Sequence, residues 1–595
     1  MERTLQGLAA RLPAWARHQP RRVAAAGGVI LLVVVLAVSC LGGSDGRADV
    51  PVVEGAPNQA VDGVRAPSDR AGGTLRVVAG PIDSLDPQRS YRPGVWNLMR
   101  LYTRTLVTFS SEPGKTDQLV PDLATDLGKV TDDGRTWTFT LREGVLFETG
   151  QPITSADVKH GIARSFAPDV VVGGPTYVVD LLDDPKNPYP GPYNREEGDP
   201  ELTSVQTPDA RTIVFHLRAP QADFPYVLAL PSSSPVPADK DTGATYGSDP
   251  VSSGPYTITS VDPKTGIVLD RNPRWNPKTD QVRSALPDRV VVRTGLSGVE
   301  RDQALLAGSA DVDISGTGVQ SATTARLSDE EDDPLRQRVD DLTTRSVRLL
   351  AMPLDVAPFD QPACRAAVAA AVDRRAVQKD LGGSSNAVRT SQLWPRGMAG
   401  APAERDPAPD PQAARAALAE CGHPEGFGTV LAVNDVGSNV QAARGIAAQL
   451  GEIGIQVEVR PFETEAFYGA EVSSPANVRK NGYGLVLATW TADFPTPGSF
   501  LTPLVDGRGI KRIGNTNYAG LNVPGINKLI DTARTATDAR AARAAWQKVA
   551  TAARDADAYV PLATSRVQLF AGQRLHNGVV MLPYNGYDLA TAGVR

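Results

Sequence analysis

The chain has few of the residues that build metal centres and reactive nucleophiles. Its 595 residues include only five histidines and three cysteines. The histidines beyond the N-terminal segment share no spacing typical of a metal site; they are His160, His216, His423 and His576. The sequence also lacks Gly-x-Ser-x-Gly, His-Glu-x-x-His, Cys-x-x-Cys and P-loop motifs. These absences argue against an enzyme and predict neither a metal site nor a cofactor.

The charge of the chain has no strong bias. The formal net charge is −6, and basic residues form no stripe of the kind that binds nucleic acid. The composition is that of a globular protein. The roughly 520 residues that follow the first 71 are enough for several domains.

The first 71 residues have a composition of their own. A basic segment precedes the uncharged run "VAAAGGVILLVVVLAVS" (23–39), which stops at Cys40. This pattern predicts an export signal over residues 1–40. "AVSC" resembles the lipobox of bacterial lipoproteins, with Cys40 as the lipidated residue and Ala37 where leucine is usual. An uncleaved membrane helix is the alternative. Residues 41–71, rich in Gly, Pro, Asp and Ala, predict a flexible tether.

Cys364 and Cys421 are the cysteines that remain after Cys40. "PACRAAVAAAVDRRAVQ" places Cys364 on a helical stripe with Val368 and Val372, and "DPQAARAALAECG" predicts a capped helix whose apolar face includes Cys421. An even pair in an oxidising compartment favours a disulfide. Two separate buried thiols would give the same pattern.

Strand and helix patterns occur in mixed order. The alternation in "TWTFT" (136–140) after an Asp-Gly turn predicts a hairpin, and Thr154 with Asp157 predicts a capping box. Later, "GTVLAV" (428–433), a helical segment and "IQVEVRPF" (455–462) form a strand, helix, strand unit, which implies parallel pairing. We expect mixed sheets in two or more lobes, with ligands at strand ends and between lobes.

One acidic residue near the C-terminus has two interpretations. In "ATWTADFPTPGSF" (488–500), Asp493 follows Trp490 and precedes Phe494, in a stretch whose prolines forbid a helix or a central strand. Asp493 is either a turn residue that caps nearby amides, or an acid walled by aromatic rings that holds a ligand ammonium.

Several motifs occur in order along nearly the whole chain after residue 71. They include "SLDPQ", the stretch from "LVPDLATDL" to "TSADVKHGIARS", "SSGPYTI", "ALLAGSADVD" and "WTADFPTPGSFLTPL". Together they resemble the extracytoplasmic solute-binding proteins of the peptide/nickel class (family 5), the lipoprotein receptors of ABC importers for oligopeptides and dipeptides. The resemblance implies an α/β, two-lobed periplasmic-binding-protein fold with mixed sheets, a hinge and an extra domain inserted in the first lobe.

The resemblance also implies domain boundaries. We expect residues 72–115, 205–298 and 558–595 to form the first lobe, residues 116–204 the inserted domain, and residues 299–557 the second lobe.

A binding site follows from the same resemblance. In peptide-binding members the acid of a Trp-x-x-Asp element receives the α-ammonium of the peptide, which assigns this role to Asp493. Trp490 and Phe494 would wall the pocket, and Tyr102 would present its ring to the cleft. Thr496-Pro497 stands where Asp-Pro is usual, so the rim of the pocket departs from the family pattern.

The implied function is that of a monomeric receptor without catalytic activity. It would be lipid-anchored to the outer face of the bacterial cell membrane, capture an oligopeptide or dipeptide between two closing lobes, and deliver it to a permease and its ATPase. Two alternatives stay open: the same fold with an oligosaccharide or metal chelate as ligand, and a signalling lipoprotein that does not serve transport.

Overall fold

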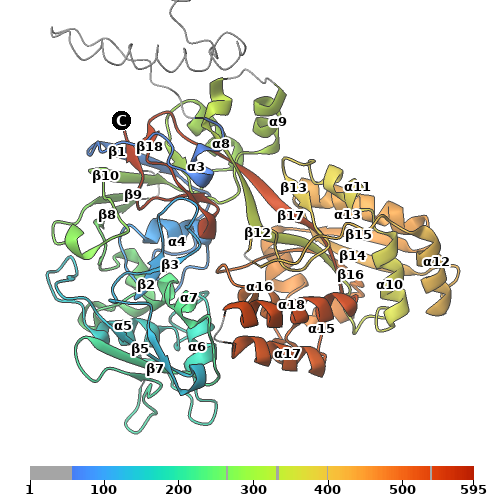
Figure 1. Ribbon diagram of the computed structural model, residues 1–595, viewed down its shortest axis with the longest axis horizontal. Coiled ribbons are helices and arrows are strands. Elements are labelled where there is room, and N and C mark those ends of the chain that lie inside the picture. The colour runs from blue at the N-terminus through green and yellow to red at the C-terminus, as the bar shows by residue number, and fades with distance from the viewer. Residues whose placement is uncertain (1–55, 194, 263–264, 330–333, 399, 537–538) are drawn as a thin grey trace, which may run out of the picture. The chain divides into compact units, whose positions relative to one another are not determined.

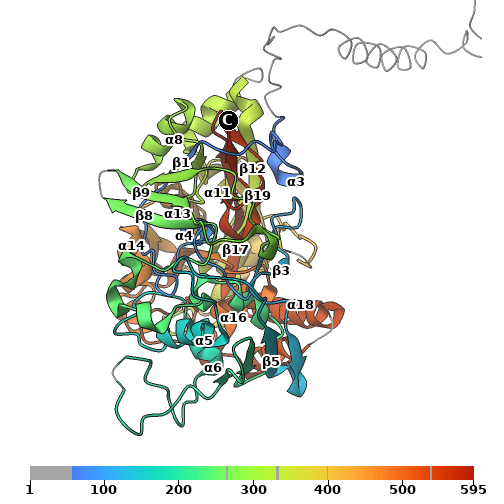
Figure 2. The same ribbon diagram turned by 90° about the vertical axis from the view of Figure 1, so that its left-hand side faces the viewer.

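The computed structural model describes residues 56–595, except residues 194, 263–264, 330–333, 399 and 537–538. The predicted export signal and Cys40 lie outside the described residues. Within the described part of the chain, every helix is too short or too polar to cross a bilayer. Figures 1 and 2 show the arrangement of the elements in two perpendicular views.

The first lobe is built on a five-stranded mixed sheet in the order β11-β1-β10-β9-β8. β1 pairs in parallel with β10 and β11, whereas β10, β9 and β8 follow one another antiparallel. The strands alternate between buried and more exposed residues, as Val290 and Val292 of β10 show. The bounds are β1 (Thr74–Val78), β8 (Tyr256–Asp262), β9 (Gly266–Arg271), β10 (Arg289–Arg293) and β11 (Val312–Asp313).

A four-stranded antiparallel sheet, in the order β4-β5-β7-β6, forms the inserted domain. The predicted hairpin is present, and Thr154 and Asp157 form the predicted capping box at the start of α5. β7 pairs with β5, so the predicted boundary at residue 204 cuts through this sheet and is too early. The bounds are β4 (Lys129–Thr131), β5 (Thr136–Thr140), β6 (Val205–Gln206), β7 (Thr212–His216), α5 (Ser155–Arg164) and α6 (Tyr177–Leu182).

The second lobe contains a six-stranded mixed sheet in the order β13-β17-β12-β16-β14-β15. The predicted strand, helix, strand unit is confirmed, because β14 and β15 pair in parallel and α13 connects them. The bounds are β12 (Val339–Ala351), β13 (Ala387–Arg389), β14 (Gly428–Asn434), β15 (Gln456–Phe462), β16 (Leu485–Thr491), β17 (Tyr559–Phe570) and α13 (Gly437–Gly451).

Helices cover both faces of this second sheet (Figure 1). Alternate residues of the strands point to opposite cores: Leu349 packs with one cluster, and Leu350 with the other. One core includes side chains of α16 (Pro497–Val505), α17 (Pro524–Arg534) and the C-terminal part of α18 (Ala539–Asp555). The other includes side chains of α10 (Pro362–Ala371), α11 (Arg374–Asp380), α12 (Pro411–Glu420) and α13.

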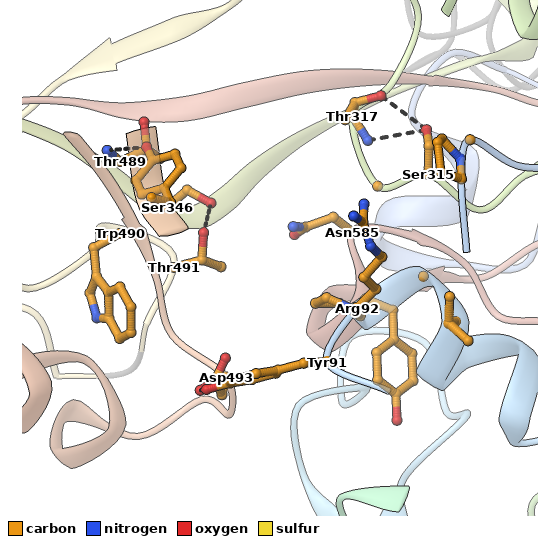
Figure 3. Close-up of a pocket in the computed structure, with 18 of the residues that line it drawn as sticks. Tyr91, Arg92, Ser315, Thr317, Ser346, Thr489, Trp490, Thr491, Asp493 and Asn585 are labelled. Carbon is orange, nitrogen blue, oxygen red and sulfur yellow. Dashed lines mark hydrogen bonds between the residues drawn. The ribbon is translucent and has the colours of Figure 1, made fainter. Parts of the chain in front are cut away.

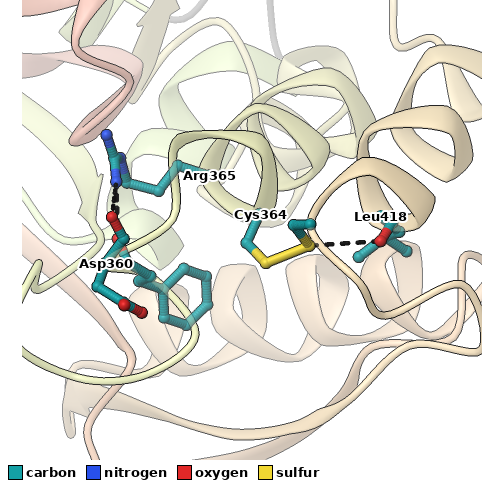
Figure 4. The surroundings of a disulfide bond; sticks show 6 residues. Asp360, Cys364, Arg365 and Leu418 are labelled. Carbon is teal, nitrogen blue, oxygen red and sulfur yellow. Dashed lines mark hydrogen bonds between the residues drawn. A yellow bond between two sulfur atoms is a disulfide. The ribbon is translucent and has the colours of Figure 1, made fainter.

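Cys364 of α10 and Cys421, at the end of α12, form a disulfide bond in this second core (Figure 4). Their Cα atoms lie 5.4 Å apart, within the range that a disulfide requires. Both side chains are buried, as the apolar patterns of the two helices predicted, and the bond between them decides between a disulfide and two separate thiols.

The antiparallel strands β12 and β17 connect the two lobes. At one end, Val339 and Phe570 pack with Val78 and Leu305 of the first lobe. At the other end, the strands belong to the second sheet. The second lobe therefore begins near residue 339 and not at 299, because β11 still pairs with β1. The chain returns to the first lobe after β17 and not at residue 558.

The last part of the predicted tether is packed against the protein. α3 (Gln59–Asp62) lies beside β12 (Figure 2). The buried Arg65 donates hydrogen bonds to both carboxylate oxygens of Asp340, which also accepts one from the Tyr587 hydroxyl. A buried and paired guanidinium of this kind holds its segment in place, so the predicted boundary at residue 71 is too late.

Candidate functional site

A cavity of about 840 Å³ lies between residues of the first and second lobes. The first lobe contributes residues 79–82, 91–95, 314–317 and 584–585, and the second lobe contributes residues 489–491, Asp493 and residues 514–516. Figure 3 shows Trp490, Thr491 and Asp493 on one side and Tyr91, Arg92 and Asn585 on the other. This placement agrees with the expectation that ligands of such folds bind between lobes and at strand ends.

Asp493 stands where β16 ends and the chain turns. β16 ends at Thr491, Pro497 is the first residue of the helix α16 that follows, and the Thr496 side chain caps this helix. Among the described residues, the Asp493 side chain accepts hydrogen bonds only from distant parts of the chain and from no nearby amide, as a turn-capping side chain would.

The two carboxylate oxygens of Asp493 have different surroundings. Oδ2 accepts a hydrogen bond from the Tyr91 hydroxyl at 2.7 Å and another from the Tyr177 hydroxyl. Tyr91 precedes α4 (Pro93–Met99) in the first lobe, and Tyr177 begins α6 in the inserted domain. Oδ1 accepts no hydrogen bond from any described residue. One oxygen thus joins the lobes, and the other is available to a donor in the cavity.

Burial raises the pKa of the Asp493 carboxyl above its ordinary value. The hydrogen bonds from Tyr177 and Tyr91 and the charge of Arg345 oppose this rise without cancelling it. Asp493 also raises the pKa of both tyrosines, although burial is the larger cause for each. The hydroxyls therefore stay protonated and act as donors to the carboxylate.

Arg345 is the buried cation behind this site. It lies on β12 where the pairing with β17 is irregular, between Thr343 and Val347. Its Nε and Nη1 are buried and find no acceptor among the described residues. Burial lowers the pKa of Arg345 to about 10, so the guanidinium stays charged at neutral pH. It offsets part of the negative charge of Asp493 from outside the cavity lining.

The structure brings only some of the predicted site residues to the cavity. Trp490 lines it, and its indole Nε1 donates to the carbonyl of Phe500 at 3.1 Å, which fixes the ring. Phe494 points away and packs between Tyr177 and Tyr226 of the first lobe and its inserted domain. Tyr102 is fully buried, and its hydroxyl donates to the Leu85 carbonyl. Tyr102 and Phe494 are not wall residues of this cavity.

Sequence reasoning missed the two tyrosines that hold Asp493. Tyr91 is 402 residues from Asp493 and Tyr177 is 316 residues away. Neither lies in a motif that predicts ligand contact, because a tyrosine beside a loop or at a helix start is common. Their role follows only from the approach of the two lobes.

The described residues contain no group of three or more His, Cys, Asp or Glu side chains that could hold a metal ion. The polar lining that the described residues give the cavity consists mainly of hydroxyl, amide and arginine groups, with Asp493 as the one carboxylate among them. Such a lining suits a solute bound by charge and hydrogen bonds.

The protein has two lobes with mixed sheets, and the antiparallel strands β12 and β17 connect them beside the cavity. This arrangement is that of a two-lobed binding protein. Residues 118–512 match the family described as "Bacterial extracellular solute-binding proteins, family 5 Middle". The chain therefore belongs to this family of extracellular solute-binding proteins.

Known proteins with similar sequences or structures carry different ligand names. The solved structure of "Clavulanic acid biosynthesis oligopeptide binding protein 2" is 40% identical, covers 91% of this chain and 99% of its own, and has a TM-score of 0.87. Heme-binding protein A of Haemophilus influenzae is 27% identical over 82% of this chain and 86% of its own length. Glutathione-binding protein GsiB of Salmonella typhi is 25% identical over 65% of this chain and 70% of its own length.

Proposed function

We propose that this protein captures peptides in the cavity between its lobes and presents them to the permease of an ABC importer. The observation that carries the proposal is the open Oδ1 of Asp493, which among the described residues is the only carboxylate that lines the cavity. An ammonium placed there would make a charge-assisted hydrogen bond in a site with little water. The oligopeptide-binding name of the 40% identical structure supports the same ligand class.

Closure of the two lobes on the ligand would prepare the protein to deliver it to the permease. The Tyr91 and Tyr177 hydroxyls reach Asp493 only when the lobes are together, and a ligand that contacts both lobes favours the closed state by its differential affinity. The permease would recognise the closed form. Lipidation at Cys40 would keep the protein at the membrane surface.

A thermal-shift titration tests the proposal. Short peptides with a free N-terminus are compared with the same peptides acetylated at the N-terminus. A ligand at about one hundred times its Kd should stabilise the protein by roughly 2.7 kcal/mol. We expect only the free-amine peptides to raise the Tm of the wild type, and Asp493→Asn to lose this effect. Asp169→Asn, at an exposed position, is the control.

The names of two relatives make a solute other than an ordinary α-linked peptide the second candidate, because one is a heme-binding protein and the other binds glutathione, a γ-linked tripeptide. Heme, glutathione, oligosaccharides and metal chelates therefore belong in the same titration. A shift with one of these compounds that does not depend on Asp493, together with no shift from any peptide, would replace the peptide proposal.

A further inference from the structure

The first described residues of the chain lie across the beginning of the connecting strand β12. The backbone N–H of Asn58 donates to the carbonyl of Val339 at 2.9 Å, and the backbone N–H of Asp341 donates to Oδ1 of Asn58 at 2.7 Å. Asn58 therefore bonds to β12 on both sides of Asp340. Residues 56–68 thus form a strap, the N-terminal strap, over the start of this strand.

Asp340 is the buried centre of the contact between the strap and β12. Its Oδ1 accepts hydrogen bonds from the backbone N–H of Ala60 and from Nη2 of Arg65, each at 2.9 Å. Its Oδ2 accepts from Nε of Arg65 at 2.9 Å and from the Tyr587 hydroxyl at 2.6 Å. Arg65 also donates from Nη1 to the carbonyl of Gln337 at 2.5 Å. Both charged groups are buried, so loss of either leaves an uncompensated charge in the interior.

The strap is also attached to the last part of the chain, which belongs to the first lobe. Arg65 and Gly578 exchange both backbone hydrogen bonds, at 2.8 and 3.1 Å. The Asn577 side chain accepts from the backbone N–H of Ser68 and donates to its carbonyl. The strap therefore joins residues 337–341 to the first lobe through contacts on both of its sides.

β12 enters the second sheet a few residues after the strap. Its pairing with β16 begins at Ser346, opposite Thr491. On the other connecting strand, β17, pairing with β13 reaches Ser565. Both connecting strands, which run between the lobes in Figure 1, thus join the second sheet at the same level. Residues 342–345 of β12 lie between the part that the strap contacts and the part that belongs to the second sheet.

The pairing of the two connecting strands is interrupted in this short stretch. β12 and β17 pair regularly up to Thr343 and again from Val347, so residues 344–346 lie opposite Ser565 alone. A bulge of this kind bends its strand and disrupts the ladder. The guanidinium of Arg345 within it has a buried Nε and Nη1 without an acceptor among the described residues. This stretch is therefore held less firmly than the strap or the second sheet.

We propose that the N-terminal strap confines the hinge to residues 342–345 of β12 and thereby limits how easily the two lobes separate. With the strap in place, bending is restricted to this short stretch. Without it, residues 337–341 would be attached to the first lobe by fewer contacts, mainly the pairing with β17 and a small apolar cluster. The flexible part would lengthen, and the open state would gain conformational entropy. The inference does not depend on which solute the cavity binds.

A hydrogen bond between the lobes, well away from the strap, reports on their separation. The backbone N–H of Ala222, just before α7 (Phe224–Leu228), donates to the carbonyl of Arg534 at the end of α17, at 3.3 Å. Figure 1 shows α17 far from α3. Ala222 is exposed, so its N–H exchanges with solvent once this bond opens. The N–H of Phe224 is the internal reference, because its acceptor is the carbonyl of Gln221 in the same segment.

The test measures hydrogen exchange in the ligand-free full chain for the wild type, Arg65→Met and Asn58→Gly. Arg65→Met removes the buried ion pair. Asn58→Gly removes the acceptor of the Asp341 N–H, and glycine suits the φ of 63° at this position. We expect exchange at Ala222 to become about threefold faster or more in both variants, because the lobes open more often. Exchange at Phe224 should stay unchanged.

Arg104→Met is the matched control. Arg104 is also buried, and its carboxylate partner Asp122 lies in the first lobe away from β12 and keeps Arg283 as a counter-ion. This variant should lose overall stability, measured by equilibrium unfolding in urea, without faster exchange at Ala222.

Faster exchange at Ala222 in either strap variant, with no such change in Arg104→Met, supports the inference. Unchanged exchange at Ala222 in both strap variants would overturn it. Equal acceleration in Arg104→Met would also overturn it, because the effect would then follow from lower overall stability and not from release of the hinge. If Arg65→Met does not fold, Asn58→Gly alone decides, since it leaves the buried ion pair in place.

Discussion

Asp493 shows how one carboxylate can serve two purposes. Oδ2 is occupied by two tyrosine hydroxyls from the first lobe and its inserted domain, and Oδ1 remains open to the cavity. The hydroxyls are neutral, so they orient the acid without cancelling its charge. A ligand ammonium would then meet a carboxylate that is already oriented. Folding has already removed most of the water from this carboxylate, so binding does not have to.

The raised pKa of Asp493 predicts how ligand binding depends on pH. An ammonium favours the ionised acid, so the pKa of Asp493 is lower in the complex than in the free protein. Affinity for a free-amine peptide should be highest above the pKa that Asp493 has in the ligand-free protein, and it should fall as pH decreases toward the pKa of Asp493 in the complex. Because burial raises the pKa of Asp493 in the ligand-free protein, the loss of affinity should begin at a higher pH than for an exposed aspartate.

Calorimetry between about pH 4 and pH 7 checks this expectation, because the α-amino group of the peptide stays protonated throughout that range. The residual affinity of Asp493→Asn should change little with pH. A wild-type Kd that stays constant down to pH 4 would contradict an ionic contact at Asp493.

The helices α10 and α12 are covalently linked by the disulfide bond between Cys364 and Cys421. The disulfide joins α10 to the end of α12 across a separation of 57 residues. The same helices pack through Val368 and Leu418 in a shared core, so the bond reinforces an interface that burial already favours.

Removing the disulfide should lower the free energy of unfolding. In the chain-entropy description, a loop of this length corresponds to about 4 kcal/mol. We expect the double variant Cys364→Ala and Cys421→Ala to unfold at lower denaturant concentration, measured by equilibrium unfolding in urea. A reducing agent should shift the wild type in the same direction and leave the double variant unchanged. Identical unfolding of the wild type with and without reductant would contradict the prediction.

For the whole molecule, contacts between lobes lie outside the cavity as well as inside it. The ring of Phe494 lies 5.4 Å from that of Tyr177 and 5.9 Å from that of Tyr226, measured between centroids. Phe494 thus carries an apolar side chain from the second lobe into the core of the first. Such a contact stabilises the closed arrangement through burial.

Phe494→Ala should therefore shift the protein toward an open state. We expect a larger radius of gyration in small-angle scattering without ligand, and weaker peptide binding, because part of the binding free energy must then close the lobes. Phe427→Ala is the control, since Phe427 contacts Phe359 and His423 within the second lobe. An unchanged radius and an unchanged Kd in Phe494→Ala would show that this ring does not contribute to closure.

Local patterns in the sequence predicted much of the fold. The capping box at Thr154, the hairpin of β4 and β5 and the parallel unit of β14 and β15 are present. The domain boundaries were less accurate because β12 and β17 belong to both lobes, and a strand that connects two cores has no local signal at the point where it leaves one. The packing of Arg65 on Asp340 was missed for the same reason: the partner is 275 residues away.

The sequence by itself determined the family, the mixed α/β architecture, the apolar faces that carry the two cysteines and the position of Asp493 after a strand. These features depend on residues a few positions apart, whose periodicity and turn chemistry act locally. Only the tertiary structure decided that Phe494 packs away from the cavity and that Tyr91 and Tyr177 hold one oxygen of Asp493. Each of these depends on contacts between distant segments, which the closure of two lobes creates and which no local pattern encodes.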